Sequence, residues 1–178
     1  MPTYVAFLRA INLASKRKFP ASEIRRCLDA AGYDDVATHI NSGNVRLTTS
    51  ERKRSALETD LEDLFLADRG FEVTTVAFTT ADFAAVADDT LAIAAEYKPG
   101  RHYVSLMRDA PSRKVAAEAE SSAPDQIKLI VRGRALHYLV AADHPTGGVD
   151  ITKAERIFGK MTNRNANVVT TIADKWCR

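Results

Sequence analysis

Apolar and polar residues along the first half of the chain alternate in an order that predicts strands and helices in turn. An apolar run of strand length covers residues 4–11, and a polar loop covers residues 12–19. Pro20 suits the first turn of a helix, where its missing N–H costs nothing. The apolar residues that follow it recur on one helical face: Ile24, Cys27, Leu28 and Ala31.

The next segments complete a recognisable order of elements. Strands are expected over residues 36–40 and 45–49, a helix capped by Ser50 runs to about Arg69, and a strand covers residues 71–78. The order β-α-β-β-α-β, with a hairpin in the middle, is that of a split βαβ or ferredoxin-like unit. The first half is therefore predicted to be a ferredoxin-like α+β unit.

The second half echoes this order more loosely. Lys98-Pro99-Gly100 marks a boundary, because Pro and Gly interrupt regular structure. We therefore predict a ferredoxin-like subdomain over residues 1–97 and a smaller α+β subdomain over residues 98–178, whose two closing helices pack back on the first subdomain. The expected segments are a short helix at 81–87, a strand at 102–107, a helix at 112–120, a hairpin of 126–131 with 135–140, and two helices with apolar faces over 151–161 and 168–176.

Composition narrows the class of protein. No apolar run approaches the roughly 20 residues that span a bilayer, and the N-terminus lacks the pattern of a secretory signal. Cys27 and Cys177 are expected to be reduced thiols, so the prediction is a cytoplasmic protein without a membrane segment. The net charge of +2 argues against a protein dedicated to coating polyanions.

A first polar cluster follows the first strand. It consists of Arg9, Asn12 and the basic loop Lys16-Arg17-Lys18. A charged residue in an apolar strand needs a partner or a ligand if it faces inward. Alternatively, Arg9 lies at the strand end and its head group reaches solvent. A local basic patch of this kind favours anionic ligands.

A second polar cluster lies at the predicted hairpin turn, over Asn41-Ser42-Gly43-Asn44. Successive backbone N–H groups in a turn with positive φ form a concavity that binds anions. The plainer interpretation is a good hairpin turn, which these residue types favour on their own. His39, just before the turn, is the only titratable candidate for a general base within the motifs, although a surface or core histidine is the commoner role.

A third polar cluster, residues 162–167, is expected between the two closing helices. Asparagine is a good helix N-cap, which explains one or two of these residues. Arg164 beside Asn165 needs a further reason, because a helix N-terminus with Arg and Asn donors is a common place to hold phosphate or carboxylate.

Several sites are excluded by their missing motifs. The sequence has no phosphate-binding loop of the Gly-x-x-x-x-Gly-Lys-Ser/Thr type, no dinucleotide fingerprint and no His-Glu-x-x-His. The four histidines have no ligand-like spacing with cysteines or carboxylates. We therefore expect no metal site and no cofactor.

The three clusters carry a family resemblance. Leu8-Arg9-Ala10-Ile11-Asn12-Leu13-Ala14-Ser15, the stretch 38–45 and the stretch 162–168 resemble, in order, three patterns of the bacterial family called domain of unknown function 1697. Those patterns are Leu-Arg-Gly-Ile-Asn-Val-Gly-Gly, Thr-Tyr-Ile-Gln-Ser-Gly-Asn-Val and Thr-x-Arg-Asn-Trp-Asn-Thr. The resemblance implies that the clusters form one unit, and it implies no particular activity. This chain has Ala10, Ala14 and Ser15 in place of three glycines, and Ala166 in place of a Trp.

Three hypotheses about function follow, with the oligomeric state left open. In the leading one, the protein binds a phosphate-bearing ligand, either a nucleotide, a single-stranded nucleic acid or another phosphorylated small molecule. Three residues would neutralise the phosphate: Arg9, Lys18 and Arg164. Five would position the ligand by hydrogen bonds, and Gly43 would supply the turn; the five are Asn12, Asn41, Ser42, Asn44 and Asn165. The lack of an aromatic pair on a candidate strand disfavours nucleic acid. The alternatives are an enzyme acting on a small phosphorylated or carboxylated metabolite, with His39 as base and Arg164 as anchor, and a structural polar network at the subdomain junction.

Overall fold

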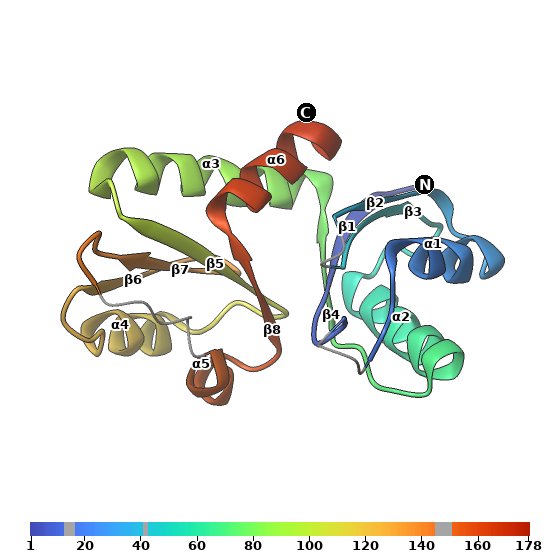
Figure 1. Cartoon of the computed structure of the whole chain (residues 1–178), viewed down its shortest axis with the longest axis horizontal. Coiled ribbons are helices and arrows are strands. Elements are labelled where there is room, and N and C mark those ends of the chain that lie inside the picture. The colour runs from blue at the N-terminus through green and yellow to red at the C-terminus, as the bar shows by residue number, and fades with distance from the viewer. Residues whose placement is uncertain (13–16, 41–42, 145–150) are drawn as a thin grey trace. The chain divides into compact units, whose positions relative to one another are not determined.

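A computed structural model describes residues 1–12, 17–40, 43–144 and 151–178 (Figure 1). The chain divides into two compact units, Met1–Phe83 and Ala84–Arg178. Each unit is built on a four-stranded antiparallel sheet. The predicted α+β class is therefore confirmed. The predicted boundary between residues 97 and 98, and the packing of the closing helices on the first subdomain, stay predictions.

The first unit has the ferredoxin-like order that the sequence predicts. Its elements are β1 (Thr3–Leu8), α1 (Ala21–Ala30), β2 (Asp34–His39), β3 (Asn44–Thr48), α2 (Arg54–Arg69) and β4 (Thr75–Thr79). The sheet order is β2-β3-β1-β4. Alternate residues of β1, Tyr4, Ala6 and Leu8, join the core with the apolar faces of α1 and α2, which cover one face of the sheet (Figure 1).

The second unit repeats this order with two more helices. Its elements are α3 (Thr80–Tyr97, which begins in the first unit), β5 (Arg101–Met107), α4 (Arg113–Ser121), β6 (Ile127–Arg132), β7 (Ala135–Val140), α5 (Ile151–Phe158), β8 (Met161–Asn165) and α6 (Ala166–Trp176). The sheet order β6-β7-β5-β8 matches that of the first unit, strand for strand. In Figure 1, α4 and α5 lie against one face of this sheet, and α3 and α6 lie against the other.

Three segments differ from the prediction. Residues 161–165 lie between the two closing helices, as predicted, but they form strand β8, paired with β5, and the predicted segments of the second half include no strand there. The predicted closing helices are present on either side of it, as α5 and α6. The helix predicted over 81–87 continues to Tyr97. Helix α2 begins at Arg54 without a side-chain cap, so Ser50 is not its N-cap.

Glutamates on helices satisfy the outer N–H groups of two edge strands. Glu62 accepts a hydrogen bond from the Thr75 N–H at 2.9 Å, and the fully buried Glu58 accepts one from the Ala77 N–H at 2.8 Å. In the second unit, Glu120 of α4 accepts from the Val131 N–H of β6 at 2.7 Å. Because a bare edge invites pairing with another strand, these carboxylates protect β4 and β6.

Candidate functional site

The first two polar clusters lie side by side in the first unit. The Leu8 N–H donates to the Gly43 carbonyl oxygen at 2.7 Å, where β1 ends beside the hairpin turn. Gly43 has φ +71°, and a Cβ there would lie 2.7 Å from Leu8 Cβ, so the turn requires glycine. Asn41 and Ser42 lie outside the described residues. The sequence prediction for these two therefore stays a prediction.

Asparagine side chains in this region bind backbone groups of their own loops. Asn12 Nδ2 donates to the Phe19 carbonyl at 3.0 Å, and Asn12 Oδ1 accepts from the Phe19 N–H at 2.8 Å. Asn44 is fully buried, and its Nδ2 donates to the His39 carbonyl at 3.0 Å. These hydrogen bonds hold the ends of the loop 12–19 and of the hairpin together.

Backbone strain is concentrated in the same two loops. Positive φ angles occur at Ala10 (58°), Asn12 (56°), Arg17 (56°) and Ile40 (50°). This region is costly for a residue with a side chain, and most costly for a β-branched one such as Ile40. The family pattern has glycine at the place of Ala10, where glycine adopts this φ without strain.

The charged candidates of the first unit have different surroundings. Arg9 is half-buried, and burial lowers its pKa. Lys18 is exposed. The neighbouring Arg17 donates to the Glu72 carbonyl and lies 5.2 Å from the centre of the Phe71 ring. His39, the candidate base, is half-buried at the end of edge strand β2, opposite Asn44.

The third cluster belongs to the second unit. Arg164 lies on β8 with its side chain 9% exposed, and its Nη1 donates to Thr162 Oγ1 at 2.8 Å and to the Asn163 carbonyl at 2.7 Å. Burial lowers the pKa of Arg164 to about 10, so the guanidinium stays protonated at neutral pH. Its strand neighbour Asn165 is exposed and serves as the N-cap residue of α6.

A pocket of about 540 Å³, here called the α6 pocket, lies where β8 runs into α6 and where α3 runs into β5. Its polar and charged lining residues are Lys98, Arg101, His102, Tyr103, Asn165 and Asn167. The first residues of α6 also line it, and the Asn165 side chain makes no capping hydrogen bond to them. No Asp or Glu is among the described residues of this lining, and Arg164 does not belong to it either.

A histidine pair, made of the fully buried His137 and the half-buried His102, adjoins the α6 pocket. His102 Nε2 on β5 lies 3.0 Å from His137 Nδ1 on β7. Burial lowers the pKa of His102 to about 4, and burial together with the charges of His102 and Arg132 lowers the pKa of His137 to about 3. The outer nitrogens, His102 Nδ1 and His137 Nε2, are buried and have no hydrogen-bond partner among the described residues.

Sequence reasoning missed this pair. The two histidines are 35 positions apart, and only the β5–β7 register, which pairs Val104 with His137, brings them to one face of the sheet. The available signal was alternation: His102 shares its parity with Val104, and His137 shares its parity with Leu139, both of which are buried.

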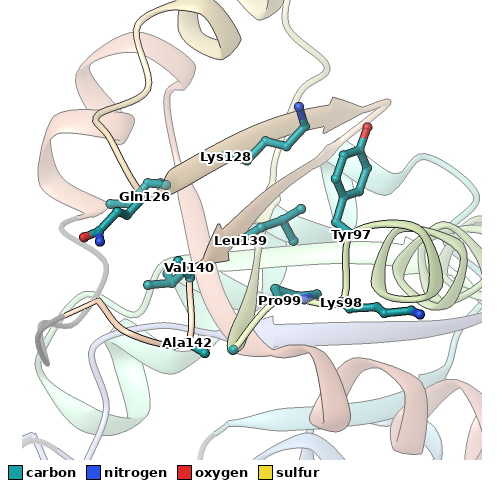
Figure 2. A pocket seen from close by; sticks show the side chains of 11 residues that line it. Tyr97, Lys98, Pro99, Gln126, Lys128, Leu139, Val140 and Ala142 are labelled. Atoms are coloured by element: carbon teal, nitrogen blue, oxygen red, sulfur yellow. The ribbon is translucent and has the colours of Figure 1, made fainter.

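A second cavity of about 440 Å³, here called the Tyr97 pocket, shares Lys98, Pro99 and Gly100 with the α6 pocket. Figure 2 shows its lining, with Leu139 beside Lys128 and Tyr97, and with Val140 between Gln126 and Ala142. The ammonium group of Lys128 lies 4.8 Å from the centre of the Tyr97 ring. Lys98, Pro99 and Gly100 belong to the lining of both pockets.

Two further kinds of site were sought in the part of the chain that the structure describes. It contains no group of three or more His, Cys, Asp or Glu side chains placed to hold a metal ion. None of its helices is long and apolar enough to cross a membrane.

Comparison with known proteins gives a family but no activity. The chain shares its fold with a solved structure titled "The structure of conserved bacterial protein SP0830 from Streptococcus pneumoniae", with a TM-score of 0.72 and 19% identity over 97% of each chain. No curated protein matches the chain. The model of the family described as "Protein of unknown function (DUF1697)" matches residues 1–137, which include the first two polar clusters and both histidines of the pair. The chain therefore belongs to the DUF1697 family, as its motifs predicted.

Proposed function

We propose that the protein binds a phosphate-bearing ligand of the size of a mononucleotide, with the phosphate in the α6 pocket. One observation carries this proposal: the first turn of α6, without a side-chain cap, lines a cavity together with Lys98 and Arg101. The free N–H groups and the dipole at a helix N-terminus favour anions. A volume of about 540 Å³ is within the ordinary range of small-ligand sites.

The charges around this pocket support the same ligand class. Arg101 lines the pocket, and its Nη2 donates to the His144 carbonyl at 3.1 Å, which leaves its positive charge in place. Lys98 is exposed at the rim, where a flexible ammonium group meets a phosphate as a point charge. Since no carboxylate is found among the described lining residues, an incoming anion meets only attractive formal charges there.

The neighbouring Tyr97 pocket favours a nucleotide over a single-stranded nucleic acid. The two pockets share the lining residues Lys98, Pro99 and Gly100, and we propose that a ligand with its phosphate in the α6 pocket places its base across this segment, beside Tyr97. Tyr97 is 41% exposed and offers an aromatic surface to a base. Single-stranded nucleic acids instead need a row of stacking side chains along a basic groove.

For the polar residues of the first unit, the structural alternative is favoured by specific contacts. The side chains of Asn12 and Asn44 hydrogen-bond to backbone groups of their own loops, which is the role expected of a structural network. The hypothesis that Arg9, Lys18 and the turn at Gly43 join Arg164 and Asn165 in one ligand site stays a separate proposal.

A calorimetric titration tests the proposed function. Adenosine 5′-monophosphate and other mononucleotides are titrated into wild type and two variants that each lose one positive charge, Lys98→Gln at the pocket and Lys114→Gln on α4. Lys114 is 85% exposed and does not line the α6 pocket, so it controls for net charge. We expect Lys98→Gln to weaken binding by about fivefold or more and Lys114→Gln to have little effect.

Two results would overturn the proposal. The first is the absence of binding by any mononucleotide at millimolar concentration. The second is an equal loss of affinity in the two lysine variants. Lys18→Gln is titrated as a third variant, and a loss of affinity seen only there would move the site to the first unit and favour the three-cluster hypothesis.

A further inference from the structure

His102 belongs both to the lining of the α6 pocket and to the histidine pair. It lines the pocket, and its Nε2 lies 3.0 Å from Nδ1 of the fully buried His137. When both rings are neutral, one of these two nitrogens donates a proton to the other. Whichever tautomer is present, one outer nitrogen of the pair is then a donor and the other an acceptor. Neither outer nitrogen has a partner within the described ranges.

The groups that face the pair are cationic or neutral. The positive charge of Arg132, at the end of β6, lowers the pKa of His137. Lys98 and Arg101 line the pocket beside His102. From α6 the pocket receives Asn167 and the positive end of the helix, and from α3 it receives Ala94. Arg164 shares the same face of the sheet, because β5 pairs Val104 with His137 on one side and with Arg164 on the other. An added proton on the pair therefore meets no negative charge among the described residues around it.

An anion in the pocket reverses this balance. A charge of opposite sign within about 4–6 Å stabilises the protonated form of a histidine and raises its pKa by about one to three units. A phosphate monoester carries close to two negative charges above its second pKa of about 6, whereas a diester carries one. The monoester is therefore expected to raise the pKa of the histidine pair more than the diester does.

On the basis of the proposed function, we propose that the His102–His137 pair takes up a proton from solvent when a phosphate monoester enters the α6 pocket. The pocket then distinguishes monoesters from diesters by charge, and it binds monoesters more tightly as the pH falls from 8 towards 6.5. The added proton goes to the outer nitrogen that was the acceptor, so both outer nitrogens are then protonated, one proton remains between His102 Nε2 and His137 Nδ1, and no covalent bond to the ligand forms.

Calorimetry at pH 7.4 in two buffers of different ionisation enthalpy measures this proton directly. The ligands are adenosine 5′-monophosphate and the methyl ester of its phosphate, which is a diester. We expect the monophosphate to take up at most about 0.3 proton, the uptake at pH 7.4 of a group whose pKa rises by about three units from about 4, and the diester to take up less. Binding of a dianion without the histidine pair releases protons instead, because the free monoester is partly protonated at this pH.

Variants assign the proton to the pair. His102→Gln removes the titrating ring at the pocket, so the proton uptake and the rise in affinity between pH 8 and 6.5 are both expected to disappear. His39→Gln is the matched control in the first unit and is expected to keep both. Nitrogen-15 NMR of the wild-type imidazoles, with and without monophosphate, reads the protonation state even if His102→Gln does not fold.

The outcomes separate the two levels of the argument. No binding of either ester by wild type overturns the proposed function and this inference with it. Three results overturn this inference alone. The monophosphate binds without proton uptake, or the uptake is unchanged in His102→Gln, or both imidazoles are neutral in the complex.

Discussion

The two units share one strand order but use their polar residues differently. In the first unit, the amides of Asn12 and Asn44 are engaged in holding backbone loops. In the second, α3 and α6 are additions to the common frame, and the junctions α3–β5 and β8–α6 form a pocket with an uncapped helix start and the histidine pair. The comparison teaches that the two helices added to the common frame complete the candidate pocket, together with residues of β5 and β8.

The sharpest test of the structural role of the first unit is Gly43→Ala. At φ +71° and with Leu8 Cβ 2.7 Å from the added methyl group, the substitution combines backbone strain with a steric clash. We expect a loss of about 2–4 kcal/mol in the free energy of unfolding, measured by urea denaturation. Gly32→Ala is the control, because Gly32 has φ +81° but no atom within 4 Å of the added Cβ. It should lose only about 1 kcal/mol, and equal losses would contradict a tight turn at Gly43.

The edge-strand carboxylates give a second comparison between the units. Glu58→Leu leaves the buried Ala77 N–H and the Arg54 guanidinium, 2.5 Å from the carboxylate, without this acceptor. We expect a loss of about 2–3 kcal/mol. Glu120→Leu removes the matching contact to Val131 at an exposed position, so water replaces it and a loss below about 1 kcal/mol is expected. Denaturant unfolding measures both, and a larger loss in Glu120→Leu would refute the ranking.

Acid should act first on the second unit. The folded-state pKa values of about 4 for His102 and about 3 for His137 lie below the ordinary value of 6.5, so the unfolded chain binds more protons between these limits. Stability from this pair is fully present above pH 6.5 and falls as the pH drops towards 3. We expect a loss of about 2 kcal/mol between pH 6.5 and 4.5, after discounting for the partial exposure of His102.

Hydrogen exchange across this pH range, followed separately for β1–β4 and β5–β8, measures the difference. In the first unit the carboxylate of Asp68 has a lowered pKa because Arg26 hydrogen-bonds to it, so its contribution is lost only at lower pH. Faster acid-induced exchange in the first unit than in the second would contradict the prediction. His137→Phe should flatten the pH dependence of the second unit.

The smallest effect concerns strain at the end of β1. Ala10 has φ 58°, so Ala10→Gly relieves the strain and is expected to change stability by less than about 1 kcal/mol, in the favourable direction. Ala67→Gly, at an exposed position in α2, should instead lower stability by up to about 1 kcal/mol. Thermal unfolding of the two variants compares the signs, and a loss in both would mean that Ala10 is not strained.

Much of the fold follows from local sequence patterns. The apolar stripe of α1 and the hairpin of β6 and β7 were predicted nearly to the residue, because apolar periodicity and turn residues agree there. The helix predicted over residues 81–87 ended ten residues before α3 does, because Asp88 and Asp89 interrupt its apolar pattern. In the structure the helix continues through both aspartates to Tyr97, and the hydroxyl of the buried Thr90 donates to the Val86 carbonyl at 2.7 Å.

Strand β8 and the histidine pair could not be predicted from such local patterns. Residues 161–165 are mostly polar, yet Thr162 and Arg164 are buried, opposite the buried Leu106 and Val104 of β5, and they hydrogen-bond to each other. A polar run of this kind looks like a loop when only its neighbours in sequence are considered. The histidine pair and the lining of the α6 pocket depend on which strands are neighbours, which is a property of the tertiary structure.

The most direct test of the account observes the helix start itself. Amide ¹H–¹⁵N NMR spectra of the whole chain are recorded as adenosine 5′-monophosphate is added. The account predicts the largest shifts at the N–H groups of Ala166, Asn167 and Val168, which line the α6 pocket. Shifts confined to Gly43 and Asn44, or no shifts at millimolar ligand, would contradict it.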